Sequence, residues 1–289
     1  MKSKLLLVNL LLCFIGFSQL PNTDIWLFNL KIKDKKTIIE KGKNITNREG
    51  YDNQPSFSED GEKIYFVSIK ADKQADIFYY HLGNKKTIQL TKTQESEYSP
   101  TLATNKSSVT SVVVQKDSSQ IIQSIVFDKK EQLLKTTQIS NLDSIGYFTF
   151  LNSDTIIYYK LTQPHSLRYY SISKNEDKWL GNNPIRGFKA INRHTLIYGL
   201  KDSSKVTFYT YDFVLHKSEK YTVYNSLNED IIWNAPWGLV KSEGSKLLNF
   251  NPEKKEWNIL FDLTTYGIKK ITRFNFDKKN KYLVVVDNL

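Results

Sequence analysis

Cysteine is almost absent from this sequence. Among 289 residues only Cys13 is a cysteine, and it lies inside an apolar run near the N-terminus. A bacterial lipoprotein needs a small residue directly before its lipidated cysteine, whereas Leu12 precedes this one. If the run is removed during export, the remaining chain can form no disulfide, no thiolate metal site and no cysteine nucleophile.

Glycine and proline are also scarce, with 12 and 7 residues, which excludes collagen-like and low-complexity structures. Hydrophobic residues make up 40% of the chain and aromatic residues 13%, enough for a buried core. The 17 tyrosines and 16 phenylalanines favour β-strands. We therefore expect a folded protein that is rich in strands.

One apolar segment, residues 5–17, follows two lysines and ends in the small-residue pattern Gly16-Phe17-Ser18. This is the arrangement of an export signal, so residues 1–18 are predicted to be a signal peptide that is cleaved after Ser18. The segment is short for a membrane span, although an uncleaved anchor is the alternative. Residues 19–289 are then expected to form a single domain without a stable membrane span. We expect a monomer, located in the bacterial periplasm or secreted from the cell.

Arginine is the scarce cation. The formal net charge is +11, or about +9 without residues 1–18. Only five of the 41 basic residues are arginine, and the lysines are scattered through apparent turns as KDKK, NKK, DKK and EKK. Nucleic-acid binders usually concentrate basic residues on one face, so we expect no nucleic-acid partner. The lysines are interpreted as solubilising, with attraction to anionic polysaccharide or phospholipid as the alternative.

The sequence repeats itself at intervals of 40 to 52 residues. Residues 54–60 (QPSFSED) align with residues 99–105 (SPTLATN) at a shift of 45, and residues 76–82 (DIFYYHL) align with residues 24–30 (DIWLFNL) at a shift of 52. Residues 148–158 align with residues 188–198 at a shift of 40. Repeats of about this length, each with four short alternating strands, predict the blades of a propeller.

Counting strands predicts the number of blades. Full four-strand units can be drawn over residues 52–91, 97–137, 146–180, 186–224 and 231–263. Residues 24–30 and 36–46 supply only third and fourth strands, and residues 271–276 and 281–286 supply only a first and a second. We therefore predict an all-β, six-bladed β-propeller closed by antiparallel pairing of strand 281–286 with strand 24–30, which removes exposed sheet edges.

The phrase QPSFSEDGEKIYFVS, followed by ADIFYY, resembles the WD40-like repeat of TolB-type propellers of the bacterial envelope. The match is good over residues 51–91 and fair over residues 96–128 and at both ends, while strand rhythm alone supports residues 140–263. The resemblance implies a β-propeller with a binding role. TolB itself carries an α/β domain before its propeller, whereas here strands are predicted from Asp24 onward, so a place in the Tol assembly is not implied.

Motifs of known catalytic sites are missing: the sequence has no GxSxG, HExxH, GxGxxG or DxDxDG pattern. The four histidines are spread over the predicted blades without paired spacing, so we expect no metal site and no cofactor. Asp24 and Asp76 occupy the same place in their repeats, which predicts a repeated structural role, such as bonding to the backbone amides of a turn.

The connections between blades are the expected binding surface, because they lead into the innermost strands and crowd one mouth of the channel. Three aromatic residues are the candidate anchors, and two arginines are candidates for binding carboxylates. The alternative is that the aromatics pack between neighbouring blades. The candidate binding residues are Arg48, Tyr51, Asp52, Tyr98, Arg186, Glu229, Asp230 and Trp233.

This mixture of aromatic and charged residues suits a partner protein, peptide or glycan. We therefore expect an exported, non-enzymatic propeller that binds its partner through the channel rim. The competing hypothesis is a glycoside hydrolase or polysaccharide lyase acting on acidic sugars, with two of Asp52, Glu229 and Asp230 as general acid and base.

Overall fold

The computed structural model describes residues 20–34, 36–70, 73–102, 108–128, 132–227, 229 and 231–289. These residues form 24 β-strands and one short 3₁₀ helix, Thr264–Tyr266. The predicted signal peptide, residues 1–18, lies outside the described residues. In the described part of the chain, no helix has both the length and the apolar character needed to cross a membrane.

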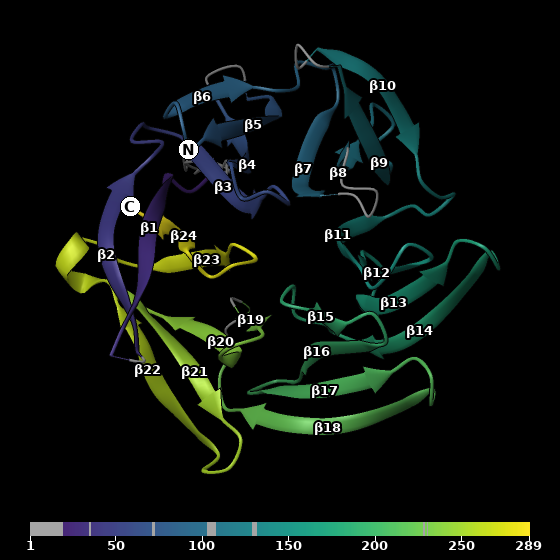
Figure 1. Cartoon of the computed structure of the whole chain (residues 1–289). Helices are drawn as coiled ribbons and strands as arrows, with labels where there is room; N and C mark the ends of the chain where they lie inside the picture. The colour runs from purple at the N-terminus through teal and green to yellow at the C-terminus, as the bar shows by residue number, and fades with distance from the viewer. Residues whose placement is uncertain are drawn as a thin grey trace, which may run out of the picture.

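Four sheets each consist of four strands that follow one another in sequence and pair antiparallel. In each of them the first strand lies nearest the centre of the molecule and the fourth lies at the periphery (Figure 1). The four sheets are β7 (Ser96–Leu102), β8 (Ser108–Val114), β9 (Gln120–Phe127) and β10 (Leu133–Gln138); β11 (Ile145–Phe150), β12 (Thr155–Lys160), β13 (Ser166–Ser171) and β14 (Glu176–Asn182); β15 (Lys189–Asn192), β16 (Thr195–Lys201), β17 (Val206–Asp212) and β18 (Lys217–Tyr224); and β19 (Ile231–Asn234), β20 (Gly238–Glu243), β21 (Lys246–Asn251) and β22 (Glu256–Asp262).

The fifth sheet has eight strands and divides into two groups of four. One group is β3 (Tyr51–Phe57), β4 (Lys63–Ile69), β5 (Ala75–His81) and β6 (Lys86–Gln89). The other joins the two ends of the described chain, with the order β23 (Ile271–Phe276), β24 (Tyr282–Asn288), β1 (Thr23–Lys33) and β2 (Lys36–Asn44). A single parallel pair, Thr23 opposite Tyr51, connects the groups.

Strands β1 and β24 pair antiparallel over their whole common length, from Thr23 opposite Asn288 to Asn29 opposite Tyr282. The strand pairing predicted between the two chain ends is therefore present. The incomplete sequence units at the two ends explain this pairing. The N-terminal unit supplies no strand on the inner side of β1, and the C-terminal unit supplies no strand on the outer side of β24.

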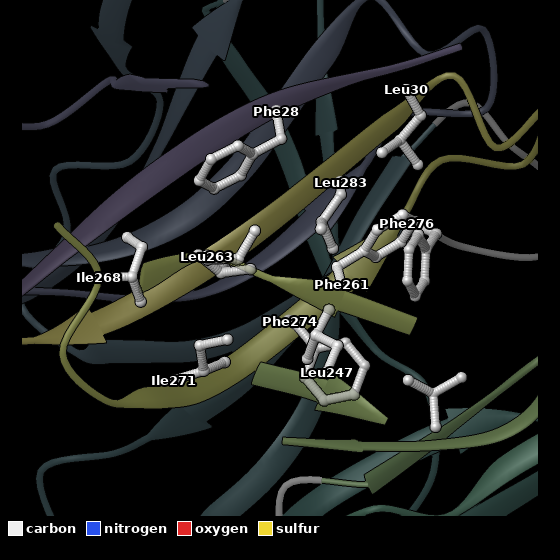
Figure 2. Packing of buried hydrophobic residues seen from close by; sticks show 12 residues of the cluster. Phe28, Leu30, Leu247, Phe261, Leu263, Ile268, Ile271, Phe274, Phe276 and Leu283 are labelled. Carbon is white, nitrogen blue, oxygen red and sulfur yellow. The ribbon is translucent and has the colours of Figure 1, made fainter. Parts of the chain in front are cut away.

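The core lies between neighbouring four-strand groups and not within one of them. Strand β24 shows the arrangement: four consecutive residues, Leu283 to Val286, are 0% exposed. Leu283 and Val285 pack against β19–β22, in the cluster drawn in Figure 2, whereas Val284 and Val286 pack against β3–β6. Burial on both faces is the reason why the inner strands are apolar at successive positions and do not alternate with polar residues.

Turn chemistry agrees with the sequence at the β3–β4 hairpin. Gly61 has a φ of 77°, a conformation that glycine adopts without steric cost. Ser58 Oγ donates to Asp60 Oδ1 at 2.5 Å, and the amide of Glu62 donates to the same carboxylate oxygen at 2.9 Å. The pattern Ser-Glu-Asp-Gly therefore stabilises the hairpin locally.

Candidate functional site: the channel mouth

A pocket of about 190 Å³ lies where the innermost strands converge. All six four-strand groups contribute to its wall, through β3, β7, β11, β19, β23 and the segment before β15. The contributing side chains are mostly short or polar, with two arginines and one carboxylate among them. They include Gln54, Ser56, Ser99, Thr101, Tyr147, Arg186, Glu229, Arg273 and Asn275.

The repeated Gln-Pro and Ser-Pro pairs shape this wall. Gln54 and Ser99 have φ angles of 57° and 53°, and both lie at a bulge in the pairing of their strand. Proline follows each of them on an inner edge, where its missing N–H removes no sheet hydrogen bond. The amide of Ser99 donates to Gln54 Oε1 at 2.6 Å. The repeated phrase thus links the innermost strands of neighbouring blades.

Charges of both signs lie at the mouth. Arg186 Nη2 donates to the carbonyl oxygen of Thr272 at 3.4 Å. Arg273 Nη2 donates to the Tyr147 hydroxyl at 3.4 Å, and its guanidinium carbon lies 5.5 Å from the centre of that ring. Glu229 accepts a hydrogen bond from Lys201, with which it forms an ion pair. The mouth is therefore a mixed polar and aromatic surface.

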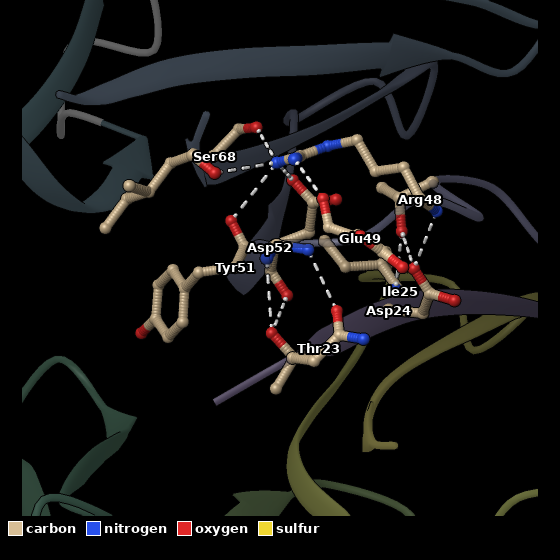
Figure 3. Close-up of polar contacts among 12 residues, drawn as sticks. Thr23, Asp24, Ile25, Arg48, Glu49, Tyr51, Asp52 and Ser68 are labelled. Atoms are coloured by element: carbon tan, nitrogen blue, oxygen red, sulfur yellow. Dashed lines mark hydrogen bonds and ion pairs between the residues drawn. The ribbon is translucent and has the colours of Figure 1, made fainter. Parts of the chain in front are cut away.

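Arg48 lies in the connection between β2 and β3, as expected, whereas Asp52 does not. Asp52 lies within β3, and its side chain is 0% exposed (Figure 3). Arg48 Nη2 contacts Asp52 Oδ1 at 2.7 Å, Ser68 Oγ at 2.5 Å and the carbonyl oxygen of Ile69 at 3.2 Å. Burial raises the pKa of Asp52, and hydrogen bonds from Ser68 and Arg48 partly offset it. This pair fixes the connection before β3 to strands β3 and β4, and it presents no exposed carboxylate to the rim.

The predicted aromatic anchors are half-buried within strands. Tyr51 on β3 and Tyr98 on β7 pack together against Val67, Ile69 and Ala75. Burial raises the pKa of Tyr51, and Tyr147 and Tyr98 raise it further while Arg186 lowers it, so these groups are near neighbours. Their packing between blades matches the alternative stated above.

Trp233 lies on β19, where its ring meets that of Tyr221 edge-on at 6.2 Å between centroids. Of the eight candidates, Arg186 and Glu229 line the pocket, and Asp230 lies outside the described residues. The sequence reasoning missed Arg273 and Tyr147, which also line it. At a shift of 219, Arg273 occupies the position of Gln54, so the repeat alignment could have indicated it.

Asp24 and Asp76 have the predicted repeated structural role. Asn44 Nδ2 donates to Asp24 Oδ2 at 2.6 Å, and Gln89 Nε2 donates to Asp76 Oδ2 at 2.9 Å. In both blades the donor is a side-chain amide at the end of the outermost strand, whereas backbone amides of a turn were the expected donors. The contact ties the third strand to the fourth.

Glu97 occupies the position of Asp52 in the next repeat, but it has no arginine. Thr93 stands where Arg48 stands in the first repeat. Thr91 donates a hydrogen bond to the Glu97 carboxyl group, and the Thr93 hydroxyl group is hydrogen-bonded to the other carboxyl oxygen. Glu97 is 2% exposed, and burial raises its pKa to about 7, with the two threonines lowering it. The first blade therefore holds an ion pair where the second holds a carboxyl group with neutral partners.

In the described ranges, no group of three or more His, Cys, Asp or Glu side chains is arranged to hold a metal ion. Glu229 is the one carboxylate from the described residues that lines the pocket at the channel mouth.

No family model matches the sequence. No curated protein sequence matches it either. Solved structures are similar over nearly the whole chain. A putative TolB from Agrobacterium tumefaciens, 10% identical, covers 93% of this chain and 99% of its own with a TM-score of 0.67. TolB from Acinetobacter baumannii is 12% identical, with 92% of this chain and 63% of that chain covered and a TM-score of 0.54.

An oligogalacturonate lyase, solved in complex with manganese, is also similar, with 12% identity, a TM-score of 0.54, and coverage of 86% of this chain and 80% of that one. At these identities the likeness shows the fold alone. The chain is therefore an all-β protein with a TolB-like β-propeller fold.

Proposed function

We propose that this chain is an exported, six-bladed β-propeller, closed by its own two ends, that binds a protein, peptide or glycan partner at its channel mouth without catalysing a reaction. The six four-strand groups and the pairing of β1 with β24 support the closed ring. The TolB-like fold and the predicted signal peptide support a place in the bacterial periplasm or secretion from the cell, as a monomer.

The observation that carries the proposed binding role is the composition of the pocket. It combines contributions from all six blades with Arg186, Arg273 and Tyr147, which are side chains that recur at recognition surfaces. Because all blades meet there, the pocket is the surface on which the largest number of independent chain segments can contact one ligand.

The competing proposal is a glycoside hydrolase or polysaccharide lyase acting on acidic sugars. The similarity to an oligogalacturonate lyase is the reason to consider it. A hydrolase of this kind needs two carboxyl groups about 5 to 10 Å apart. From the described residues the pocket receives Glu229, which is ion-paired with Lys201, and Asp52 is buried against Arg48. This arrangement favours binding over catalysis.

The experiment is affinity capture from a bacterial envelope extract with residues 19–289 as bait. Arg186→Ala and Tyr51→Ala should lose the captured partner, and Trp233→Ala tests the third anchor. Trp179→Ala is the matched control, because Trp179 is 57% exposed on the peripheral strand β14 and should not affect capture. Melting temperatures separate unfolding from lost binding. Unchanged capture by well-folded Arg186→Ala and Tyr51→Ala proteins would refute the proposed site.

A further inference from the structure

Lys189 occupies a position that recurs once in every blade. On each innermost strand, one residue lies opposite the central residue of the second strand. These central residues face the following blade, as Ile157, Ile197 and Val284 do. Lys189 is the one ionisable member of this set. The six equivalent residues are Ser56, Thr101, Thr149, Lys189, Ile232 and Asn275.

Four of these six residues line the pocket at the channel mouth: Ser56, Thr101, Ile232 and Asn275. Two of them also show which way such a side chain is directed. Ser56 Oγ donates to the carbonyl oxygen of Pro100 at 2.5 Å, and Asn275 Nδ2 reaches that of Pro55 at 3.5 Å. In both cases the acceptor is the carbonyl oxygen of the proline directly before the equivalent residue of the following blade, Thr101 or Ser56.

Strands β15 and β19 both lie near the centre of the molecule (Figure 1). The same geometry directs Lys189 from β15 toward Ile231 and Ile232 on β19. The two strands approach closely here, since a Cβ atom on Gly187 would lie 2.0 Å from the carbonyl oxygen of Ile231. Gly187, Ile231 and Ile232 all line the pocket. Lys189 therefore stands directly beside it.

Among the residues that the structure describes, the Lys189 ammonium group has no counter-charge. The side chain is half-buried, and no hydrogen bond or ion pair joins it to any residue that the structure describes. Burial lowers the pKa of Lys189, with no neighbouring charge acting against that effect. Partial burial removes water from the ammonium group, and this costs free energy that a ligand anion would partly recover.

The size of the pocket and its walls indicate the kind of ligand. Its volume of about 190 Å³ is below the range of about 300 to 1,000 Å³ that is usual for small-molecule sites, so it suits one side chain better than a chain of sugar rings. Strands β7, β11, β15 and β19 each end their sheet, so an unpaired strand edge faces the channel and offers backbone groups to an extended peptide.

We propose that Lys189 is the anion-binding group of the channel, and that it receives a carboxylate, from an acidic side chain or the C-terminus, of a bound peptide. This rests on the proposed binding function and specifies the chemistry of its ligand. Lys189 would then form a charge-assisted hydrogen bond with the inserted carboxylate, and the polar residues at the equivalent positions would contact the adjoining peptide.

Two capped peptides of alternating glycine and an acidic or amide residue, acetyl-(Gly-Glu)₃-amide and acetyl-(Gly-Gln)₃-amide, test this proposal on residues 19–289. Limiting acetic anhydride labels amines, and mass spectrometry reports the labelling of Lys189. The acidic peptide should slow that labelling several-fold, and the amide peptide should not. Lys189→Met should weaken binding of the acidic peptide about tenfold or more, whereas Lys254→Met, on an exposed turn, should leave it unchanged.

Several results would overturn the proposal: equal binding by the Lys189→Met protein, equal protection by both peptides, or protection by trigalacturonate but not by the acidic peptide. If the Lys189→Met protein does not fold, labelling of the unmodified protein still decides. The proposed function is tested separately, by capture of an envelope partner. If both the unmodified protein and Lys189→Met capture that partner, the binding role is supported and only the role given to Lys189 is refuted.

Discussion

Replacing Glu97 with glutamine should stabilise the protein above neutral pH. Thr93 Oγ1 has a single hydrogen, which it can give to the carbonyl oxygen of Glu95 at 3.0 Å, and it also contacts Glu97 Oε1. A protonated Glu97 can donate to that hydroxyl oxygen, and Thr91 Oγ1 donates to Glu97 Oε2 at 3.0 Å. A glutamine side chain offers the same donor and acceptor at every pH.

The magnitude follows from the pKa of Glu97, which burial raises from 4.5 to about 7. The folded protein then holds this proton more tightly than the unfolded chain, so stability falls as pH rises from about 4.5 to about 7 and stays at the lower level above that. A shift of this size corresponds to about 3 kcal/mol, of which roughly 2 kcal/mol falls between pH 5 and pH 8. Glutamine removes this dependence.

Urea unfolding of both proteins at pH 5 and pH 8 measures the effect. The advantage of Glu97→Gln should grow by about 2 kcal/mol from the lower to the higher pH. Asp52→Asn is the contrasting variant, because Asp52 is paired with Arg48, and its loss should destabilise by about 3 kcal/mol by leaving the cation without a counter-charge. An equal difference between Glu97→Gln and the unmodified protein at both pH values would refute the assignment of a neutral carboxyl group.

Three other predictions concern export, closure and blade spacing. Intact-mass measurement of exported protein should find an N-terminus at Gln19, and retention of residues 1–18 would contradict the predicted signal peptide. Deleting residues 271–289 removes four fully buried residues of β24 and should cost several kcal/mol, about the stability of a whole domain, so cooperative melting at the full-length temperature would contradict closure through β24. Gly187→Ala should cost about 1 to 3 kcal/mol in thermal or urea unfolding, because its Cβ would meet the Ile231 carbonyl group. Gly83→Ala, whose Cβ meets only the His81 side chain, should have a small effect. Equal stability of the two variants would contradict the close approach of the segment before β15 to β19.

Much of the architecture could be predicted from the sequence because it depends on local patterns. Strand length, hairpin turns and repeat spacing are properties of neighbouring residues, and repetition supplies independent readings of the same unit. The pairing of β1 with β24 followed from incomplete units at the two ends, and the shared role of Asp24 and Asp76 followed from their equivalent positions. These features required no knowledge of how one blade meets the next.

The channel mouth was decided by tertiary structure, because its residues come from segments that only the ring brings together. Arg273 meets Tyr147 across 126 positions of sequence, and the pocket collects side chains from all six four-strand groups. Burial is equally nonlocal: Asp52 and Glu97 lie four residues after Arg48 and Thr93, but only the packed structure shows that both carboxyl groups are buried. Sequence alone determined the blade and its repetition, whereas the raised pKa of Glu97 and the lowered pKa of Lys189 depend on how the folded chain buries them.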